Sequence, residues 1–137
     1  MTQKKEEFKP LQDGKVRMYV CGITTYDYCH LGHARMLVVF DMVVRYLRVR
    51  GFDVTYIRNI TDIDDKIIDR ANKLGMPAKE LTEKYISSFL EDMRALNIIP
   101  ADEYPRATEE ISSIIEVGQT LVDKGHAYSA NGSVYFR

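Results

Sequence analysis

No stretch of this 137-residue sequence approaches the roughly 18 uninterrupted apolar residues that a membrane-spanning helix needs. The first residues also lack the apolar segment of a secretory signal peptide. We therefore expect a cytoplasmic protein with no membrane-bound part.

The sequence also has few cysteines and almost no net charge. The two cysteines, Cys21 and Cys29, flank a short segment between an expected strand and an expected helix. A disulfide there would have to survive in a reducing compartment, so we expect two free thiols. The formal net charge of −1 gives no overall attraction to nucleic acid, so any such contact must be local. We find neither internal repeats nor low-complexity segments.

The hydrophobic pattern of the first half predicts a strand, a helix and a second strand. Residues 1–14 are polar and are expected to be a surface lead-in with little order. The strand over 15–20 leads to a helix over 32–50, whose broad apolar face predicts a largely buried element. A second strand over 52–57 completes a βαβ unit with a parallel strand pair.

Helical patterns dominate the remainder. The next helix should take Thr61 or Asp62 as its N-cap. Two further helices are predicted over 77–97, with Leu96 on the packed face, and over 107–124. Asn131-Gly132 predicts a terminal hairpin with exposed aromatic side chains, and the sequence stops inside its second strand. We therefore expect a domain that has been cut short.

Residues suited to binding or catalysis lie in the crossover between the first strand and the first helix. His30, Gly32 and His33 lie at the helix start, where unpaired N–H groups and the helix dipole favour anions. Gly32 lets a ligand lie against the backbone, and the two histidines are three residues apart. Ordinary polar capping remains the alternative interpretation of so short a pattern.

A second polar run, from Asn59 to Lys66, follows the second strand. Because parallel strands end at the same sheet edge, both crossovers should lie side by side where open sheets bind ligands. The acidic residues of this run predict either helix capping or a group that holds the amine of a small substrate. A metal site fits them less well, because one helical turn rarely points three carboxylates at one ion.

Taken together, these motifs resemble the amino-terminal half of cysteinyl-tRNA synthetases, which are class I aminoacyl-tRNA synthetases. His30-Leu31-Gly32-His33 is similar to the HIGH signature of that class, with leucine in place of the commoner isoleucine. The resemblance continues through Pro105-Arg106-Ala107-Thr108 and Lys124-Gly125-His126-Ala127-Tyr128 and covers the chain from about Glu6 onward.

The resemblance implies a truncated α/β, Rossmann-type (HUP-like) nucleotide-binding domain over 15–137, with a helical segment and a terminal β-hairpin. It implies activation of L-cysteine with ATP and Mg²⁺, transfer to tRNA(Cys), and a monomer. By position, His30 and His33 are the catalytic residues, and together with Gly32 they bind ATP. Gly22, Thr24 and Thr61 match the positions around the backbone amine and carboxylate of cysteine.

The resemblance also implies a zinc ion that takes the thiolate of the substrate, with Cys21 as one ligand. A soft thiolate binds zinc where a serine hydroxyl binds poorly, so one metal separates two nearly isosteric substrates. The other zinc ligands of the family, its KMSK loop and its anticodon-binding helices have no counterpart in these residues. We therefore expect half an active site with little or no turnover alone, and a small apolar thiol at Cys29.

Two other functions remain open. One is the cysteine ligase of mycothiol synthesis, which resembles the same motifs but joins cysteine to an amino-sugar. The other is a non-catalytic module that has kept the nucleotide-binding crossover and lost the chemistry.

Overall fold

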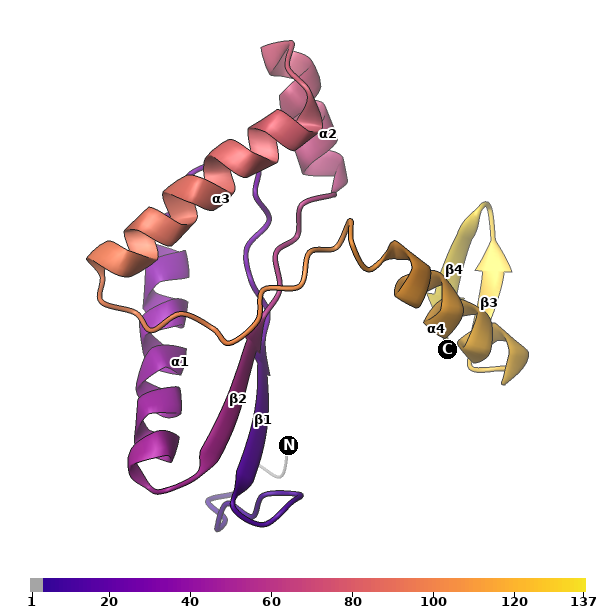
Figure 1. The fold of residues 1–137 in the computed structure, drawn as a ribbon. Helices are drawn as coiled ribbons and strands as arrows, with labels where there is room; N and C mark the ends of the chain where they lie inside the picture. Colours follow the sequence, from indigo (N-terminus) through magenta and orange to yellow (C-terminus); the bar gives the residue numbers. More distant parts are fainter. Residues whose placement is uncertain (1–3) are drawn as a thin grey trace.

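The computed structural model describes residues 4–137 as an α/β fold with two small sheets (Figure 1). In chain order the elements are β1 (Lys15–Val20), α1 (Leu31–Val49), β2 (Asp53–Arg58), α2 (Asp65–Leu74), α3 (Ala78–Ala95), α4 (Ile111–Asp123), β3 (Ala127–Ala130) and β4 (Ser133–Phe136). Within these residues no helix is both long and apolar enough to cross a membrane.

β1 and β2 form the parallel pair that the sequence predicts, in a register that runs from Lys15 opposite Asp53 to Val20 opposite Arg58. Alternate residues of both strands point toward α1, because side chains along a strand alternate between the two faces of a sheet. Val16, Val54 and Val44 thereby meet in one buried cluster. The βαβ unit is confirmed, and it sets the two crossovers at one end of the strands.

α1 is far more exposed than its pattern predicts. Its buried residues are Leu37, Asp41 and Val44, and apolar side chains such as Val39 and Met42 are exposed. The expectation of a largely buried helix is therefore wrong for the described residues. The two-stranded sheet and α3 cover only one side of the helix, and the broad apolar stripe extends beyond it.

α2 and α3 lie above the carboxyl ends of the strands (Figure 1). The N-cap of α2 is Asp64, whose side chain accepts a hydrogen bond from the backbone of Lys66 at 2.9 Å, so the predicted caps Thr61 and Asp62 are wrong. α3 buries Phe89 and Met93 against Ile23 and Leu37 of the first crossover and α1. It ends before Leu96, which is 47% exposed and not on the packed face.

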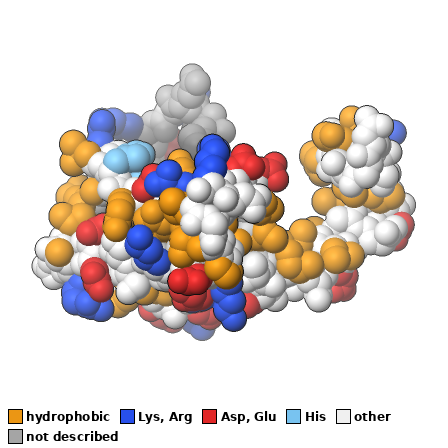
Figure 2. All heavy atoms as spheres, turned by 90° about the horizontal axis from the view of Figure 1, so that it is seen from above, with side chains coloured by type: hydrophobic (Ala, Val, Ile, Leu, Met, Phe, Trp, Pro, Cys, Tyr) orange, Lys and Arg blue, Asp and Glu red, His pale blue; other side chains and the backbone are white. Residues whose placement is uncertain are grey.

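The last three elements of the chain, α4, β3 and β4, form a small lobe set apart from the β1–β2 sheet (Figures 1 and 2). α4 starts at Ile111, four residues later than predicted, and has no buried residue. The hairpin β3–β4 is confirmed, with Asn131 and Gly132 at φ angles of 51° and 79° in its turn. Tyr128 and Tyr135 are exposed on the hairpin, as expected, and their rings stack on each other.

The lead-in predicted over 1–14 falls partly outside the described residues, because positions 1–3 are not among them. The remainder lies at the surface but is anchored. Phe8 contacts Phe52 edge to face with the ring centroids 5.9 Å apart, and Gln12 bridges Lys15. No helix or strand occurs before Lys15 among the described residues, and the expectation of little order stays a prediction.

Candidate functional site

The two crossovers lie side by side at the carboxyl ends of β1 and β2. Thr24 and Thr61 form a parallel bridge beyond the ends of the strands. The amide of Thr61 donates to the carbonyl of Ile23 at 3.1 Å, and the amide of Thr25 donates to the carbonyl of Thr61 at 3.1 Å. The ladder thus continues into the candidate site, and it holds Thr24 and Thr61 together as the sequence predicts.

Gly22 is the point of closest approach between the crossovers. A Cβ atom added there would overlap the backbone carbonyl of Asn59, so only glycine fits. The Gly22 amide donates to Oδ1 of Asn59 at 2.7 Å. Gly22 therefore lies at the same edge as Thr24 and Thr61. The contact of Asn59 with Gly22 was not predicted. A polar residue directly after a buried strand was the signal available for it.

His30 caps α1. Its Nδ1 accepts from the amide of Gly32 at 3.0 Å, and Nδ1 of His33 accepts from the amide of His30 at 3.3 Å. A backbone N–H can only donate, so both Nδ1 atoms are unprotonated and each neutral ring carries its proton on Nε2. The capping interpretation is therefore correct, and it leaves each histidine with an N–H donor for another partner.

The two imidazole rings stack, with centroids 3.9 Å apart and planes inclined by 21°. Partial burial holds the pKa of His33 below its usual value of 6.5, and electrostatic repulsion between the two imidazole rings lowers it further. A methyl group on Gly32 would lie 2.8 Å from Cε1 of His30, so glycine gives the ring its place over the helix start. The arrangement offers neutral N–H donors at the positive end of a helix dipole.

The loop that leads to His30 is anchored on α2 and α3. Tyr28 packs edge to face against Tyr85 with centroids 5.1 Å apart. Asp27 pairs with Arg70 at 3.7 Å, and the ammonium of Lys84 lies within 5.9 Å of the Tyr28 ring. These contacts fix the position of the helix start from above, and the sequence pattern does not predict any of them.

Both cysteines are free thiols, as expected. Cys21 is exposed at the end of β1, and Cys29 packs beside the cluster of Ile23 and Leu37. Burial raises the pKa of the Cys29 thiol, and the charge of Asp92 raises it further. No group of three potential metal ligands occurs among residues 4–137. Cys21 alone does not fit a zinc site, so we derive no chemical step through zinc.

A latch beside the site holds the start of the small lobe. Asp62 accepts from the amide of Thr108 at 2.9 Å and from its hydroxyl at 2.6 Å. Arg106 pairs with Glu83, and this hydrogen bond lowers the pKa of the Glu83 carboxyl and raises that of the Arg106 guanidinium. Asp62 thus serves a long-range contact instead of the predicted helix cap.

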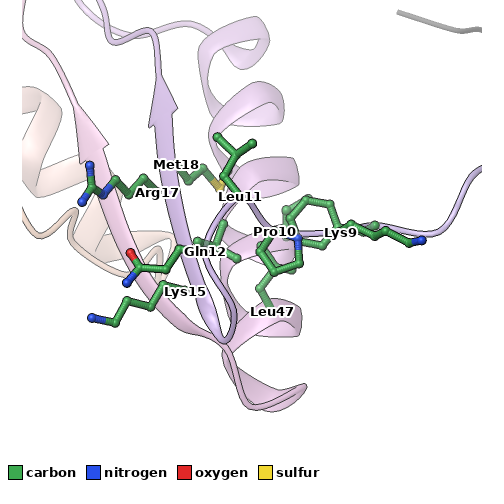
Figure 3. Close-up of a pocket in the computed structure, with 11 residues that line it drawn as sticks. Lys9, Pro10, Leu11, Gln12, Lys15, Arg17, Met18 and Leu47 are labelled. Atoms are coloured by element: carbon green, nitrogen blue, oxygen red, sulfur yellow. The ribbon is translucent and has the colours of Figure 1, made fainter.

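A groove of about 560 Å³ lies elsewhere, between the lead-in, β1 and α1 (Figure 3). Lys15 and Val16 from the amino end of β1 line it, together with Leu11 and Leu47. Ligands of open parallel sheets bind beyond the opposite, carboxyl ends of the strands. The groove is therefore separate from the candidate site.

Comparison with known proteins agrees with this geometry. The model of the family described as "tRNA synthetases class I (C) catalytic domain" matches residues 7–137. The methionyl-tRNA synthetase of Mycobacterium tuberculosis, solved in complex with methionyl-adenylate, matches with a TM-score of 0.71. That match covers 82% of this chain and 23% of the other at 24% sequence identity, so it shows the fold.

Curated relatives are cysteine–tRNA ligases. The one from Alkalilimnicola ehrlichii is 61% identical over 99% of this chain and 30% of its own length. The one from Maridesulfovibrio salexigens is 57% identical over 100% of this chain and 28% of its own length. The chain therefore spans less than a third of the length of these relatives.

The parallel sheet, with both crossovers at its carboxyl edge, defines a Rossmann-type nucleotide-binding fold. Within that class, the chain belongs to the family of class I (C) tRNA synthetase catalytic domains.

Proposed function

We propose that this chain supplies the amino-terminal part, residues 15–137, of the catalytic domain of an enzyme that activates L-cysteine with ATP and attaches it to tRNA(Cys). The observation that supports this most strongly is the shared edge of the two crossovers. The Thr24–Thr61 bridge and the capped start of α1 follow the same strand pair. Because the relatives are named cysteine–tRNA ligases, we choose cysteine as the amino acid that is activated.

His30 and His33 act on ATP in this proposal. When the carboxylate of cysteine attacks the α-phosphate and pyrophosphate leaves, negative charge shifts among the phosphate oxygens. The free Nε2–H groups left by the capping contacts donate to those oxygens, and Gly32 lets the phosphates approach the helix start. Removing one such preorganised donor costs about 10²–10³-fold in kcat in other enzymes.

Gly22, Thr24 and Thr61 hold the amino acid. The Thr24–Thr61 bridge and the hydrogen bond from Gly22 to Asn59 fix the backbone of these residues, so the bound amino acid contacts a rigid surface. Cys21 extends this edge and is the residue that we assign to a zinc ion beside the thiol of the substrate. A zinc site that includes it needs donors other than those of residues 4–137.

Cysteine-dependent ATP–pyrophosphate exchange tests the proposal in two samples. The first is the chain alone, and the second is a cysteine–tRNA ligase in which the chain replaces the matching residues of a relative. We expect weak or no exchange from the chain alone and exchange from the chimera that cysteine supports and serine does not. A chimera that folds but gives no cysteine-dependent exchange would contradict the proposal.

The matched variants are His30→Asn and His33→Gln. Each keeps an acceptor for the capping hydrogen bond, so the helix start should stay intact, but its carboxamide N–H replaces the imidazole Nε2–H from a different position. We expect the exchange rate of the chimera to fall about 100-fold or more for each variant, since each displaces a preorganised donor to the phosphates. Unchanged exchange would remove both histidines from the mechanism.

A further inference from the structure

The side chain of Asn59 connects both crossovers. Its Oδ1 accepts from the amide of Gly22 at 2.7 Å and from the hydroxyl of Tyr19 at 3.0 Å. The Gly22 amide can only donate, so the atom that faces it is the carboxamide oxygen. This contact fixes the orientation of the whole amide group.

The other end of the carboxamide faces Thr61. Nδ2 of Asn59 lies 3.3 Å from Oγ1 of Thr61. An amide nitrogen only donates, so the oxygen of Thr61 accepts and its own proton points away from Asn59.

The backbone of Thr61 is already used. Its amide donates to Ile23, and its carbonyl accepts from the amide and the hydroxyl of Thr25 at 3.1 and 3.2 Å. The hydroxyl proton is therefore the donor that Thr61 has left to offer.

We propose that Asn59 is a positioning residue that commits the Thr61 hydroxyl to donate to an oxygen of the bound amino acid. The acceptor is the carboxylate oxygen of cysteine or, after activation, the carbonyl oxygen of its adenylate. The ammonium group has no lone pair to accept this proton. The inference rests on the proposed function, which places Thr61 beside the amino acid.

Asn59→Asp is the variant that reverses the polarity. It keeps an acceptor for Gly22 and Tyr19 but replaces Nδ2 with a second oxygen, so the Thr61 hydroxyl turns toward it and is lost to the ligand. The new charge also acts on the ligand directly. Thr61→Val and the double variant separate the two effects, because an effect that passes through Thr61 disappears when the hydroxyl is absent.

The probe is cysteinyl-sulfamoyl adenosine, a stable analogue of the adenylate, titrated into the chimera and followed by isothermal titration calorimetry. We expect Asn59→Asp to weaken binding about tenfold, which is the loss of one hydrogen bond of about 1.4 kcal/mol. In the Thr61→Val background the same change should cost less than about twofold. Equal losses in both backgrounds would overturn the proposal.

Two controls exclude a merely structural effect. Tyr19→Phe removes a donor to the same Oδ1 but leaves Nδ2 in place, so binding of the analogue should stay within about twofold. ATP affinity should stay within about twofold in every variant, because Thr61 is assigned to the amino acid. A parallel loss of ATP affinity would assign Asn59 a general structural role and overturn the proposal.

One further readout does not depend on binding. In the unliganded chain, Thr61→Val should shift the Asn59 side-chain amide proton resonances upfield, because their acceptor is removed. Absent binding of the analogue by the unaltered chimera counts against the proposed function, whereas an unshifted amide in the chain counts against the role of Asn59.

Discussion

At the scale of single residues, Gly22 is the position where the two crossovers leave no room for a side chain. Its added Cβ would overlap the backbone carbonyl of Asn59, directly after the end of β2. The two crossovers can therefore approach this closely only because residue 22 is a glycine and has no side chain.

We expect Gly22→Ala to lower the free energy of unfolding by about 1–3 kcal/mol, because the backbone of β2 must move to admit the methyl group. Gly118→Ala is the matched control. It lies inside α4, where an added methyl group meets nothing within 4 Å, and alanine there should stabilise the helix by about 0.5–1 kcal/mol. Urea denaturation measures both, and equal stabilities would contradict the close approach.

His33 predicts a pH dependence. Its pKa in the folded chain is lowered by burial and by His30, whereas the unfolded chain has the ordinary value of about 6.5. Between these two values the unfolded state binds more protons, so stability falls as the pH drops below about 6.5.

His33→Gln removes this titration but keeps an acceptor for the amide of His30. We expect the loss of stability between pH 7.5 and 5.5 to be smaller in His33→Gln than in the unaltered chain. Urea unfolding at both pH values gives the difference, and NMR titration of the imidazole gives the pKa. A steeper loss in the variant would reverse the assigned sign.

At the scale of elements, Asp62 and Thr108 decide where the small lobe begins. Two hydrogen bonds to Asp62 hold Thr108 outside a helix, so α4 starts at Ile111. The same contact explains why Asp62 does not cap α2.

We expect Asp62→Ala to speed hydrogen exchange at the Thr108 amide about tenfold, because its acceptor is lost. Exchange in β2 should stay unchanged, since the sheet does not depend on this contact. Asp65→Ala is the control, because Asp65 has no hydrogen bond to the lobe among those that the structure describes. Equal exchange at Thr108 in the two variants would exclude the latch.

The sequence predicts those elements whose signals are local. Strand alternation predicts β1, β-branched and aromatic residues predict β2, and Asn131-Gly132 predicts the hairpin, because each signal acts within a few residues. The cap of α2 and the start of α4 were mispredicted for one reason. Thr61 is held by the bridge to Thr24, and Asp62 is held by Thr108, which is 46 residues away. A local sequence pattern does not predict contacts between residues so far apart in the chain.

The candidate site divides in the same way. The HIGH-like motif and Gly22, Thr24 and Thr61 were selected from the sequence, and the structure brings the last three together. The linking role of Asn59 depends on which atoms face each other, and that is decided only when the two crossovers meet. The exposure of α1 was also missed, because periodicity indicates an apolar face but not what covers it.

At the scale of the whole molecule, the described chain has apolar surfaces on α1 and α4. Ile115 in α4 is 65% exposed, whereas Leu37 in α1 is fully buried. The main body and the small lobe meet through a narrow connection (Figure 2), so the two parts should differ in sensitivity to substitution.

We expect Ile115→Lys to change the free energy of unfolding by less than about 0.5 kcal/mol, since the side chain makes no buried contact. Leu37→Ala should cost about 2–5 kcal/mol through the cavity that it leaves. Thermal or urea denaturation at low protein concentration compares them. A large loss for Ile115→Lys would mean that the face of α4 is covered in solution.

In the proposed function, ATP and cysteine meet at the shared carboxyl edge of β1 and β2. Backbone NMR of the chain, titrated first with Mg²⁺-ATP and then with the cysteinyl-sulfamoyl analogue, tests this directly. We expect ATP to shift the amides of residues 30–33 and the analogue to add shifts at 21–24 and 59–61. Shifts confined to residues 8–18, around the groove at the opposite end of β1, would contradict it.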